Sequence, residues 1–422
     1  MDLDRVVSEL GIVESRALLE PAWDASQDAM PEGEVRFLSP TFLREACRGI
    51  YLPEEITEAA VEAAQRVSGS PALCALAWHC HWCLYRYAHY PSRLADRWPS
   101  MEGVLGDADG LFYLLVLLSW FPHMEAVHRA HALPEPVVRE SMDQIYQRGV
   151  TCSDMFGRWG LDGHAARWLS NYLRGEIYAL GRLVHQFRVM DDPVRVYRHG
   201  ASSMVIALSE DGVSYRADGQ RFRKGDTGRM WRSRLVVTGE EIVGYPILPT
   251  GCAVEQEVAL PAGEWVPVFG RGDPVLSFHI PGGTPLDHGA CGASFRAAME
   301  FFPRYFPERP CKAFYCSSWL LDTQLEGWLP PASNLVRFLQ EFYLIPGGIS
   351  ETSILQAVFG GVPEDLSRAP GETTLQRAIL DHLLEGKRIN PGAGRCFLFP
   401  EDLDWGGQVY RNTKFPWDLI RG

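Results

Sequence analysis

The chain has 422 residues, of which 46% are hydrophobic and 11% aromatic, and its formal net charge at pH 7 is -13. This composition predicts a folded protein of two domains and excludes an intrinsically disordered chain. The acidic balance argues against nucleic acid as a partner, because proteins that bind it carry a basic face.

The N-terminal segment from Met1 to Leu10 carries acidic residues and has no apolar core, unlike a signal peptide. The longest apolar run, Leu111 to Phe121, has about half of the ~20 residues that a membrane-spanning helix needs. We therefore expect no membrane partner. The ten cysteines follow no regular spacing and are expected to be reduced thiols. The expected compartment is the cytoplasm.

Residues 1–190 are predicted to form a helical N-terminal domain. Ser39 followed by Pro40 is typical of a helix start, and the helix that Pro53 begins is closed by Gly69. Toward the end of the domain, apolar residues recur at three- to five-residue steps and predict one helix that contains Gly175 and Gly181. These apolar residues are Trp168, Tyr172, Ile177, Leu180, Leu183 and Phe187.

Residues 191–422 are predicted to form a second domain of mixed α+β structure. Short β-branched and aromatic runs separated by turn residues predict an antiparallel meander between residues 195 and 247. A strand at 275–280, a helix at 287–302 and a strand at 312–317 follow. Asp322 and Ser333 are each placed to cap a further short helix. A helix at 374–384 and a last strand at 395–399 complete the expected order.

The stretch VLSFHIPGGTPLDHGACGAS, residues 275–294, runs from a strand through a glycine-rich loop into a helix. Such a turn exposes backbone N–H groups at the positive end of a helix dipole, which suits the diphosphate of a cofactor. The alternative is a plain connection between the two elements. The residues expected to bind phosphate here are Gly282, Gly283, Gly289, Ala290, Cys291, Gly292, Ala293 and Ser294.

The segment His79-Cys80-His81-Trp82-Cys83 contains two cysteines at the spacing of a metal or redox motif. A zinc site would need a second pair of ligands, and none is evident at a suitable spacing. We therefore expect a buried helix and no metal. A thiol or zinc redox protein built on Cys80 and Cys83 remains a weaker alternative.

The runs GDPVLSFHIPGG, CGASFRAAMEFF, KAFYCSSWLLD and SNLVRFLQEF resemble a GNAT-like C-terminal domain. This domain occurs in a bacterial family described as acyltransferase-domain proteins. Upstream, GHAARWLSNYLRGEIYALGRLVHQF is similar to the close of the helical N-terminal domain that accompanies it in that family. Together the matches cover most of residues 39 to 345.

The resemblance implies a GNAT fold, an acyl-CoA donor and an amine-bearing small-molecule acceptor. The phosphate loop of the superfamily usually reads Arg or Gln, two residues, Gly, one residue, then Gly or Ala. The best overlay in this chain runs from Gly289 through Gly292 to Ser294, so its first and last positions do not match. Backbone amides need no particular side chain, so binding of coenzyme A is still expected.

GNAT chemistry needs a base for the amine and an acid for the departing thiolate. His279, on the strand that enters the loop, is the candidate base, with a pKa suited to neutral pH; its alternative is a core histidine. Cys316 and Ser318, at the end of the next strand, are candidate acids or simple strand-end groups. Asn334 is a candidate contact for the pantetheine arm or part of a helix cap.

The sequence thus predicts an acyltransferase that moves an acyl group from an acyl-CoA, acetyl-CoA or longer, to an amine of a small-molecule acceptor. The alternative is a catalytically inactive GNAT-like module that binds or regulates. The absence of a clear carboxylate base on the relevant strand favours this alternative.

Overall fold

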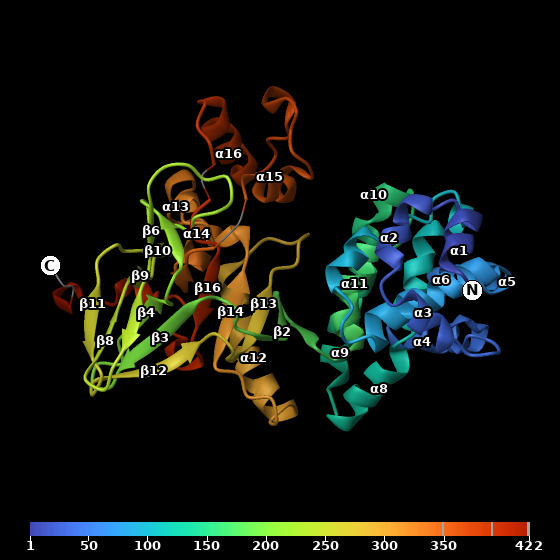
Figure 1. Ribbon diagram of the computed structural model, residues 1–422, viewed down its shortest axis with the longest axis horizontal. Coiled ribbons are helices and arrows are strands. Elements are labelled where there is room, and N and C mark those ends of the chain that lie inside the picture. Colours follow the sequence, from blue (N-terminus) through green and yellow to red (C-terminus); the bar gives the residue numbers. More distant parts are fainter. Residues whose placement is uncertain (348–349, 390, 420–422) are drawn as a thin grey trace. The chain divides into compact units, whose positions relative to one another are not determined.

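The computed structural model describes residues 1–347, 350–389 and 391–419. The chain forms two compact units, Met1–Leu180 and Gly181–Gly422 (Figure 1). Each unit has its own core of buried apolar side chains.

The first unit is helical apart from one short strand at its end. Ser39 caps a helix through the amide of Phe42, and Ser70 caps another through the amide of Leu73, as the Ser-Pro pairs at both places favour. Its helices are α1 (Leu3–Glu9), α2 (Arg16–Leu19), α3 (Trp23–Asp28), α4 (Pro40–Gly49), α5 (Glu54–Gly69), α6 (Pro71–His81), α7 (Phe112–Leu118), α8 (Phe121–Ala130), α9 (Glu135–Thr151), α10 (Ser153–Phe156) and α11 (Gly163–Leu173).

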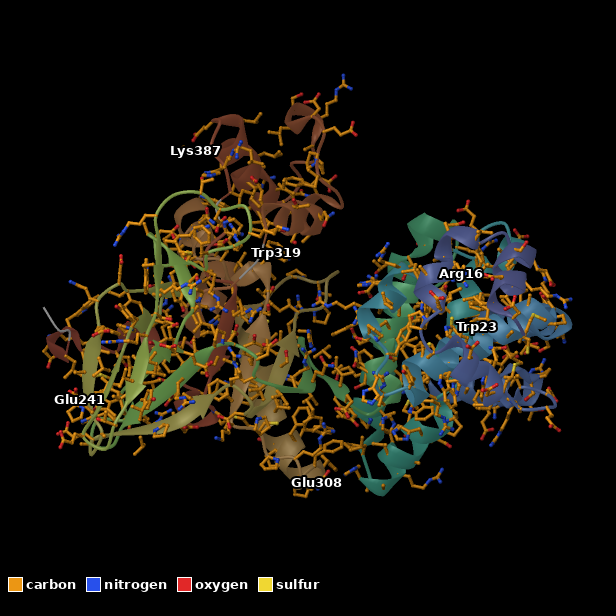
Figure 2. The ribbon with its side chains drawn as sticks, viewed as in Figure 1. Arg16, Trp23, Glu241, Glu308, Trp319 and Lys387 are labelled. Atoms are coloured by element: carbon orange, nitrogen blue, oxygen red, sulfur yellow. The ribbon has the colours of Figure 1, made fainter. Side chains whose placement is uncertain are left out.

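Short 3₁₀ turns connect several of these helices, and a single π-helical segment, Trp82–Arg86, follows α6. Every residue of α7 is buried, so this apolar helix lies at the centre of the unit. Trp23, labelled in Figure 2, is buried and donates from its indole to the carbonyl of Met1 at 2.9 Å. Within the described residues no single helix is long and apolar enough to span a bilayer; Gly106–Leu118 and Phe121–Ala130 meet that length and composition only as a pair bent by 43°.

The predicted continuous helix across residues 168–187 is wrong. Helix α11 ends at Leu173, and two strands follow, β1 (Ile177–Leu180) and β2 (Leu183–Val189). Gly175 and Gly181 have φ angles of +69° and +72°, which end the helix and turn the chain. Both faces of β1 and most of β2 are buried, so apolar residues lie on both faces of these strands. In such a stretch some apolar residues fall at a helical spacing by chance.

The second unit is built on β-sheets. Its largest sheet has the order β2–β13–β14–β16–β15 within this unit, and a second sheet has the order β10–β9–β4–β3–β12. The strands of the predicted meander are antiparallel where they pair, but a single meander is wrong: β4 pairs with β3 and with β9, whereas β5 pairs with β6 and β7 with β8 in separate sheets. The strands are β3 (Val194–His199), β4 (Val205–Ser209), β5 (Ser214–Arg216), β6 (Met230–Arg232), β7 (Leu235–Val237), β8 (Glu241–Gly244), β9 (Pro246–Leu248), β10 (Cys252–Ala253), β11 (Val258–Pro261), β12 (Trp265–Gly270), β13 (Pro274–His279), β14 (Ala313–Ser317), β15 (Tyr343–Ile345) and β16 (Arg395–Leu398).

Helices cover one face of the largest sheet, where rings from strands and helices interlock. Phe278 of β13 lies 5.0 Å from Phe295 and 5.2 Å from Phe342, measured between ring centroids. The helices of this unit are α12 (His288–Tyr305), α13 (Gln324–Trp328), α14 (Asn334–Leu339), α15 (Glu351–Phe359), α16 (Thr374–Leu384) and α17 (Val409–Asn412). A smaller apolar cluster of α15 and α16 packs against Trp319, labelled in Figure 2. The predicted α+β class is confirmed.

Candidate active site

The parallel strands β13 and β14 separate at their carboxyl ends, with α12 as the connection between them (Figure 1). Their pairing begins at Val275 opposite Ala313 and ends at Ser277 opposite Tyr315. Beyond that point β13 continues along β2 as far as His279, whereas β14 continues along β16. Backbone groups at this opening lack each other as partners, and the carboxyl ends of parallel strands are where α/β sheets usually bind ligands.

The glycine-rich loop follows β13 directly at this opening. Residues 282–285 are exposed, and Gly283 has a φ angle of +83°, which few other residues adopt. Helix α12 begins at His288, and its N-cap is Asp287. The loop therefore lies at the positive end of a helix of 18 residues.

Arg182, in the turn between β1 and β2, holds this loop. Its Nε atom donates to the carbonyl oxygen of Pro285 at 2.9 Å, and Nη2 donates to that of Thr284 at 3.0 Å. Its third nitrogen, Nη1, is buried and has no hydrogen-bond partner among the described residues. The guanidinium of Arg182 therefore contacts the loop and has one donor group left. The sequence does not indicate Arg182 as a site residue.

Several of the amides expected to bind phosphate are already used. The amide of Ala290 donates to Asp287 Oδ1 at 2.7 Å, and that of Cys291 donates to the carbonyl of Asp287 at 3.0 Å. The remaining candidate amides, those of Gly292, Ala293 and Ser294, are inside α12, where the helical hydrogen bond runs to the carbonyl four residues earlier. The groups left for an anion are the loop before Asp287 and the first amides of the helix, those of His288 and Gly289.

The side chains at the start of α12 pack the helix onto the sheet. Cys291 is fully buried, and Ser294 Oγ lies 3.0 Å from His185 Nε2 on β2. A Cβ atom added at Gly292 would lie 2.4 Å from Trp405 Cδ1, so glycine permits the close approach of that indole. Ala293, one residue further, is exposed.

His279 is the last residue of β13 and lies at the opening. Its Nε2 donates to Gln186 Oε1 on β2 at 3.0 Å, which leaves Nδ1 as the lone-pair nitrogen. Burial, with a smaller contribution from Arg188, lowers the pKa of His279 to about 4. This pKa lies below the value near neutrality that the sequence predicts, and the residue is partly buried at the end of the strand. The imidazole is neutral at pH 7.

The other candidate residues differ in their burial and in their hydrogen bonds. Cys316 is buried opposite Cys396, and burial raises the pKa of its thiol. Ser318 accepts from the amide of Leu320 at 3.3 Å, and its hydroxyl proton can still be donated. Asn334 is exposed at the start of α14, which Ser333 caps as predicted. A role for any of these residues in the reaction stays a prediction.

A buried cluster of charged and polar groups lies next to the opening on the sheet face opposite α12. Tyr315 donates its hydroxyl proton to Asp192 Oδ2 at 2.9 Å, and Arg395 forms an ion pair with the same carboxylate. Burial raises the pKa of Asp192, and Arg395 opposes this rise. Arg395 is opposite Ser317 in the ladder, so this cluster fixes the end of β14.

A second buried cluster fixes the start of α12. His288 Nε2 donates to Glu341 Oε1 at 2.9 Å, and Arg337 donates to His288 Nδ1 at 3.3 Å. The indole of Trp405 donates to the carbonyl of His288 at 2.7 Å. These partners are distant in the sequence, so no local pattern could have indicated them. The cluster ties the loop end of α12 to α14.

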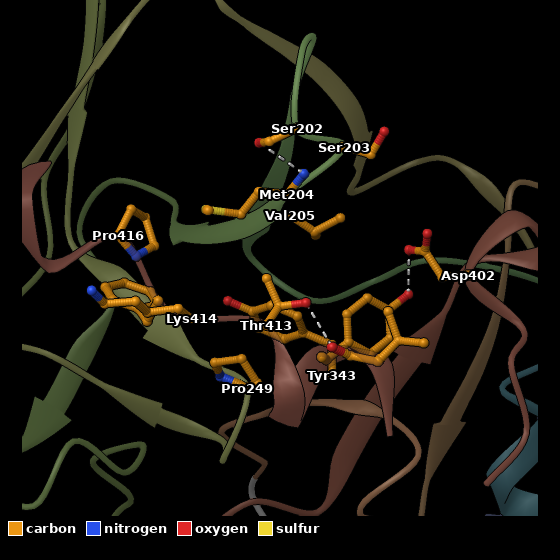
Figure 3. A pocket seen from close by; sticks show the side chains of 13 residues that line it. Ser202, Ser203, Met204, Val205, Pro249, Tyr343, Asp402, Thr413, Lys414 and Pro416 are labelled. Atoms are coloured by element: carbon orange, nitrogen blue, oxygen red, sulfur yellow. Dashed lines mark hydrogen bonds between the residues drawn. The ribbon is translucent and has the colours of Figure 1, made fainter. Parts of the chain in front are cut away.

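A separate cavity of about 160 Å³ lies in the same unit, between β4 and the C-terminal segment (Figure 3). Its main polar groups are already paired: the hydroxyl of Tyr410 donates to Asp402 Oδ2 at 2.9 Å, and Asp402 also accepts from Arg198. Because these groups satisfy one another, the cavity offers less chemistry than the opening between β13 and β14.

The segment from His79 to Cys83 lies at the end of α6 and the start of the π-helical segment, and its histidines and cysteines are buried. His79 Nδ1 lies 2.9 Å from Ser26 Oγ, and its Nε2 lies 3.4 Å from Cys83 Sγ. Across residues 1–347, 350–389 and 391–419, no group of three or more His, Cys, Asp or Glu side chains is placed to hold a metal ion.

Two family models match the chain. A GNAT-like C-terminal domain matches residues 177–396, and an N-acyltransferase N-terminal domain matches residues 41–175. The order of the two domains is the one that the sequence predicts. No curated protein matches the chain.

Crystal structures of an acyltransferase have a similar fold. The complex with decanoyl-CoA and teicoplanin is 23% identical and covers 94% of this chain and 99% of its own, with a TM-score of 0.63. The complex with CoA and 10C-teicoplanin has the same identity and coverage and a TM-score of 0.62. The complex with decanoyl-CoA is 22% identical, with 95% and 100% coverage and a TM-score of 0.59.

Proposed function

Because the chain belongs to the family of proteins with a GNAT-like C-terminal domain, we propose that it is an acyltransferase that moves an acyl group from an acyl-CoA to an amine of a small-molecule acceptor. The observation that carries this proposal is the separation of β13 from β14 beside a loop that Arg182 holds. The N-acyltransferase N-terminal domain and the fold shared with an acyltransferase that binds acyl-CoA support it.

The diphosphate of coenzyme A would bind at the loop between Ile280 and His288. The loop amides, the first amides of α12 and the spare donor group of Arg182 are suited to phosphate oxygens. The carboxylate of Asp287 opposes this binding, and its place at the helix cap is explained by its bond to Ala290. The pantetheine arm would then lie along the opening, where β13 has no strand on its β14 side.

In the proposed reaction the acceptor amine attacks the carbonyl carbon of the thioester, a C–N bond forms and the C–S bond breaks. The neutral imidazole of His279 accepts the proton that the amine loses, through Nδ1. The thiolate of coenzyme A takes a proton from the hydroxyl of Ser318 or the thiol of Cys316, and the proton that His279 has accepted then returns to that group, so that no charge is left on the enzyme. Ser318 is the better placed of the two, because Cys316 is buried.

The test combines binding with turnover. Calorimetric titration with CoA, acetyl-CoA and octanoyl-CoA should show binding of each, whereas adenosine, which has no diphosphate, should bind far more weakly. Release of free CoA thiol should then depend on an added amine. Failure of every CoA compound to bind would refute the proposal. Binding without turnover on any amine would favour a catalytically inactive module.

A further inference from the structure

The helical unit contains a cavity of about 560 Å³, and none of the residues that line it has a role in the transfer reaction proposed above. Its lining includes the aromatic rings of Phe37, Phe42, Trp78 and Trp120. The two phenylalanines are 5% and 7% exposed, so they present fixed surfaces. A volume of this size is typical of sites for small organic molecules.

His81 lies among these rings. Its ring centroid is 5.1 Å from that of Trp78, 5.3 Å from Phe37 and 6.0 Å from Trp120. Flat rigid rings in tilted and offset arrangements are suited to the faces and edges of an aromatic ligand. The walls therefore favour an aryl group over a flexible alkyl chain.

The hydrogen bonds of His81 fix which of its nitrogens is an acceptor. Ser119 Oγ donates its proton to the carbonyl of Val116 at 2.5 Å, so it accepts from His81 Nδ1–H at 2.7 Å. Nε2 then carries a lone pair, and it has no partner within the described part of the chain. The ring is only 5% exposed, and burial lowers its pKa to about 4, so it stays neutral at pH 7. Nε2 can accept from a ligand hydroxyl.

Positive charge gathers at the same cavity. Arg36 and Arg86 both line it, both are exposed, and neither forms an ion pair with a described residue. The guanidinium of Arg86 lies over the ring of Trp120 at 4.9 Å. Glu34 is the acidic residue of the lining. Two unpaired cations beside one carboxylate contrast with the net charge of -13 of the whole chain.

We propose that this cavity binds a small aryl acid that carries a hydroxyl group, with its rings against Phe37, Trp78 and Trp120, its hydroxyl donating to His81 Nε2, and its acidic group beside Arg36 and Arg86. The proposal does not rest on the proposed function, since none of its residues has a role in the transfer reaction and all belong to the helical unit. Each part of the ligand matches one feature of the cavity: the aryl group matches the aromatic rings, the hydroxyl matches the acceptor nitrogen, and the acid matches the two arginines.

The test uses three related fluorescent probes on the whole protein. These are 6-hydroxy-2-naphthoate, 2-naphthoate without the hydroxyl, and 2-naphthol without the carboxylate. The first should bind about 3- to 10-fold more tightly than the second, as one hydrogen bond provides. It should bind about tenfold more tightly than the third, because the cations lose their partner. Quenching of tryptophan fluorescence reports binding.

Two variants assign these preferences to residues. His81→Phe keeps a ring and removes the acceptor, so the preference for the hydroxyl should disappear while 2-naphthoate still binds. Arg86→Gln should reduce the preference for the carboxylate. Arg139→Gln is the matched control, because Arg139 also lies over a ring, that of Tyr51, outside the cavity. Equal binding of the three probes by the unmodified protein, no binding at all, or variants that keep both preferences would overturn the proposal.

Discussion

The Nε atom of Arg182 lies 2.9 Å from the carbonyl oxygen of Pro285, so the turn that begins the second unit is bonded to the loop that precedes α12. This relationship brings a cation from one turn to a loop more than a hundred residues later. Under the proposed function, Arg182 would supply the basic side chain that the loop itself lacks at the start of the GNAT pattern.

Arg182→Gln should weaken the binding of coenzyme A by about 10- to 100-fold, because it removes a charged donor and releases the loop carbonyls. The affinity of Arg182→Lys for coenzyme A should lie between that of Arg182→Gln and that of the unmodified protein, since a lysine keeps the charge but not the planar guanidinium. Calorimetric titration gives the constants. Arg271→Gln is the control, because Arg271 is exposed and pairs with Glu210 elsewhere in the unit. Equal affinity of Arg182→Gln and the unmodified protein would exclude Arg182 from the site.

Asp287→Ser should raise the affinity for coenzyme A by about twofold to fivefold, because it removes a negative charge beside the diphosphate while serine still caps the helix. Asp287→Ala should lower the free energy of unfolding by about 1 kcal/mol through loss of the cap. Urea unfolding and titration separate the two effects. If Asp287→Ser lowered the affinity at unchanged stability, the phosphate would have to lie away from this cap.

Much of the second unit could be predicted from local chemistry. Local sequence determines its turns and several helix caps, because the residues that form each of them lie within a few positions of one another. Examples are the caps at Asp287 and Ser333 and the capping box of Thr373 and Gln376. The hairpin around Gly181 could not, because buried strands and an apolar helix face have similar composition at short range. Because a helix is predicted across residue 182, the sequence does not indicate the turn between β1 and β2 in which Arg182 lies.

The surroundings of His279 could not be predicted from local sequence either. Strand alternation indicates His279, but its lowered pKa depends on burial and on Arg188, and its hydrogen bond depends on Gln186; both residues lie on β2, where the sequence predicts a helix. The ion pair of Asp192 with Arg395 joins residues at opposite ends of the unit. Pairings of this kind are set by sheet order, which a single sequence does not reveal.

Gly292→Ala should lower the free energy of unfolding by about 1–3 kcal/mol, because the new methyl group would overlap the indole of Trp405. Gly289→Ala is the matched substitution. Its Cβ would meet only Asp287 Oδ1, at 3.4 Å, so the gain in helix propensity should leave stability equal or up to about 1 kcal/mol higher. Thermal and urea unfolding measure both. A neutral Gly292→Ala would contradict the packing role given to this glycine.

The stability of the protein should fall as the pH is lowered from about 7 toward 4. His185 is fully buried beside Ser294, and burial lowers its pKa to about 3. Between this pKa and the ordinary value near 6.5, the unfolded chain binds a proton that the folded chain does not, so acid favours unfolding. His185→Phe should make the free energy of unfolding depend less steeply on pH in this window. An unchanged slope in urea titrations at pH 5, 6 and 7 would show that His185 is not responsible.

His279→Gln should lower kcat by about 10²- to 10⁴-fold if the imidazole accepts the proton of the amine, whereas the binding of acyl-CoA should stay the same. Glutamine can still donate to Gln186 Oε1, so the strand keeps its hydrogen bond while the basic nitrogen is lost. Since the pKa of His279 is about 4, its ionisation should not limit the rate between pH 5 and 8, and the ionisation of the acceptor amine should dominate the profile. A rate limb near pH 6.5 that disappears in His279→Gln would show a more solvated base than the structure has. Full turnover by His279→Gln would remove this histidine from the reaction and leave the amine to lose its proton to water.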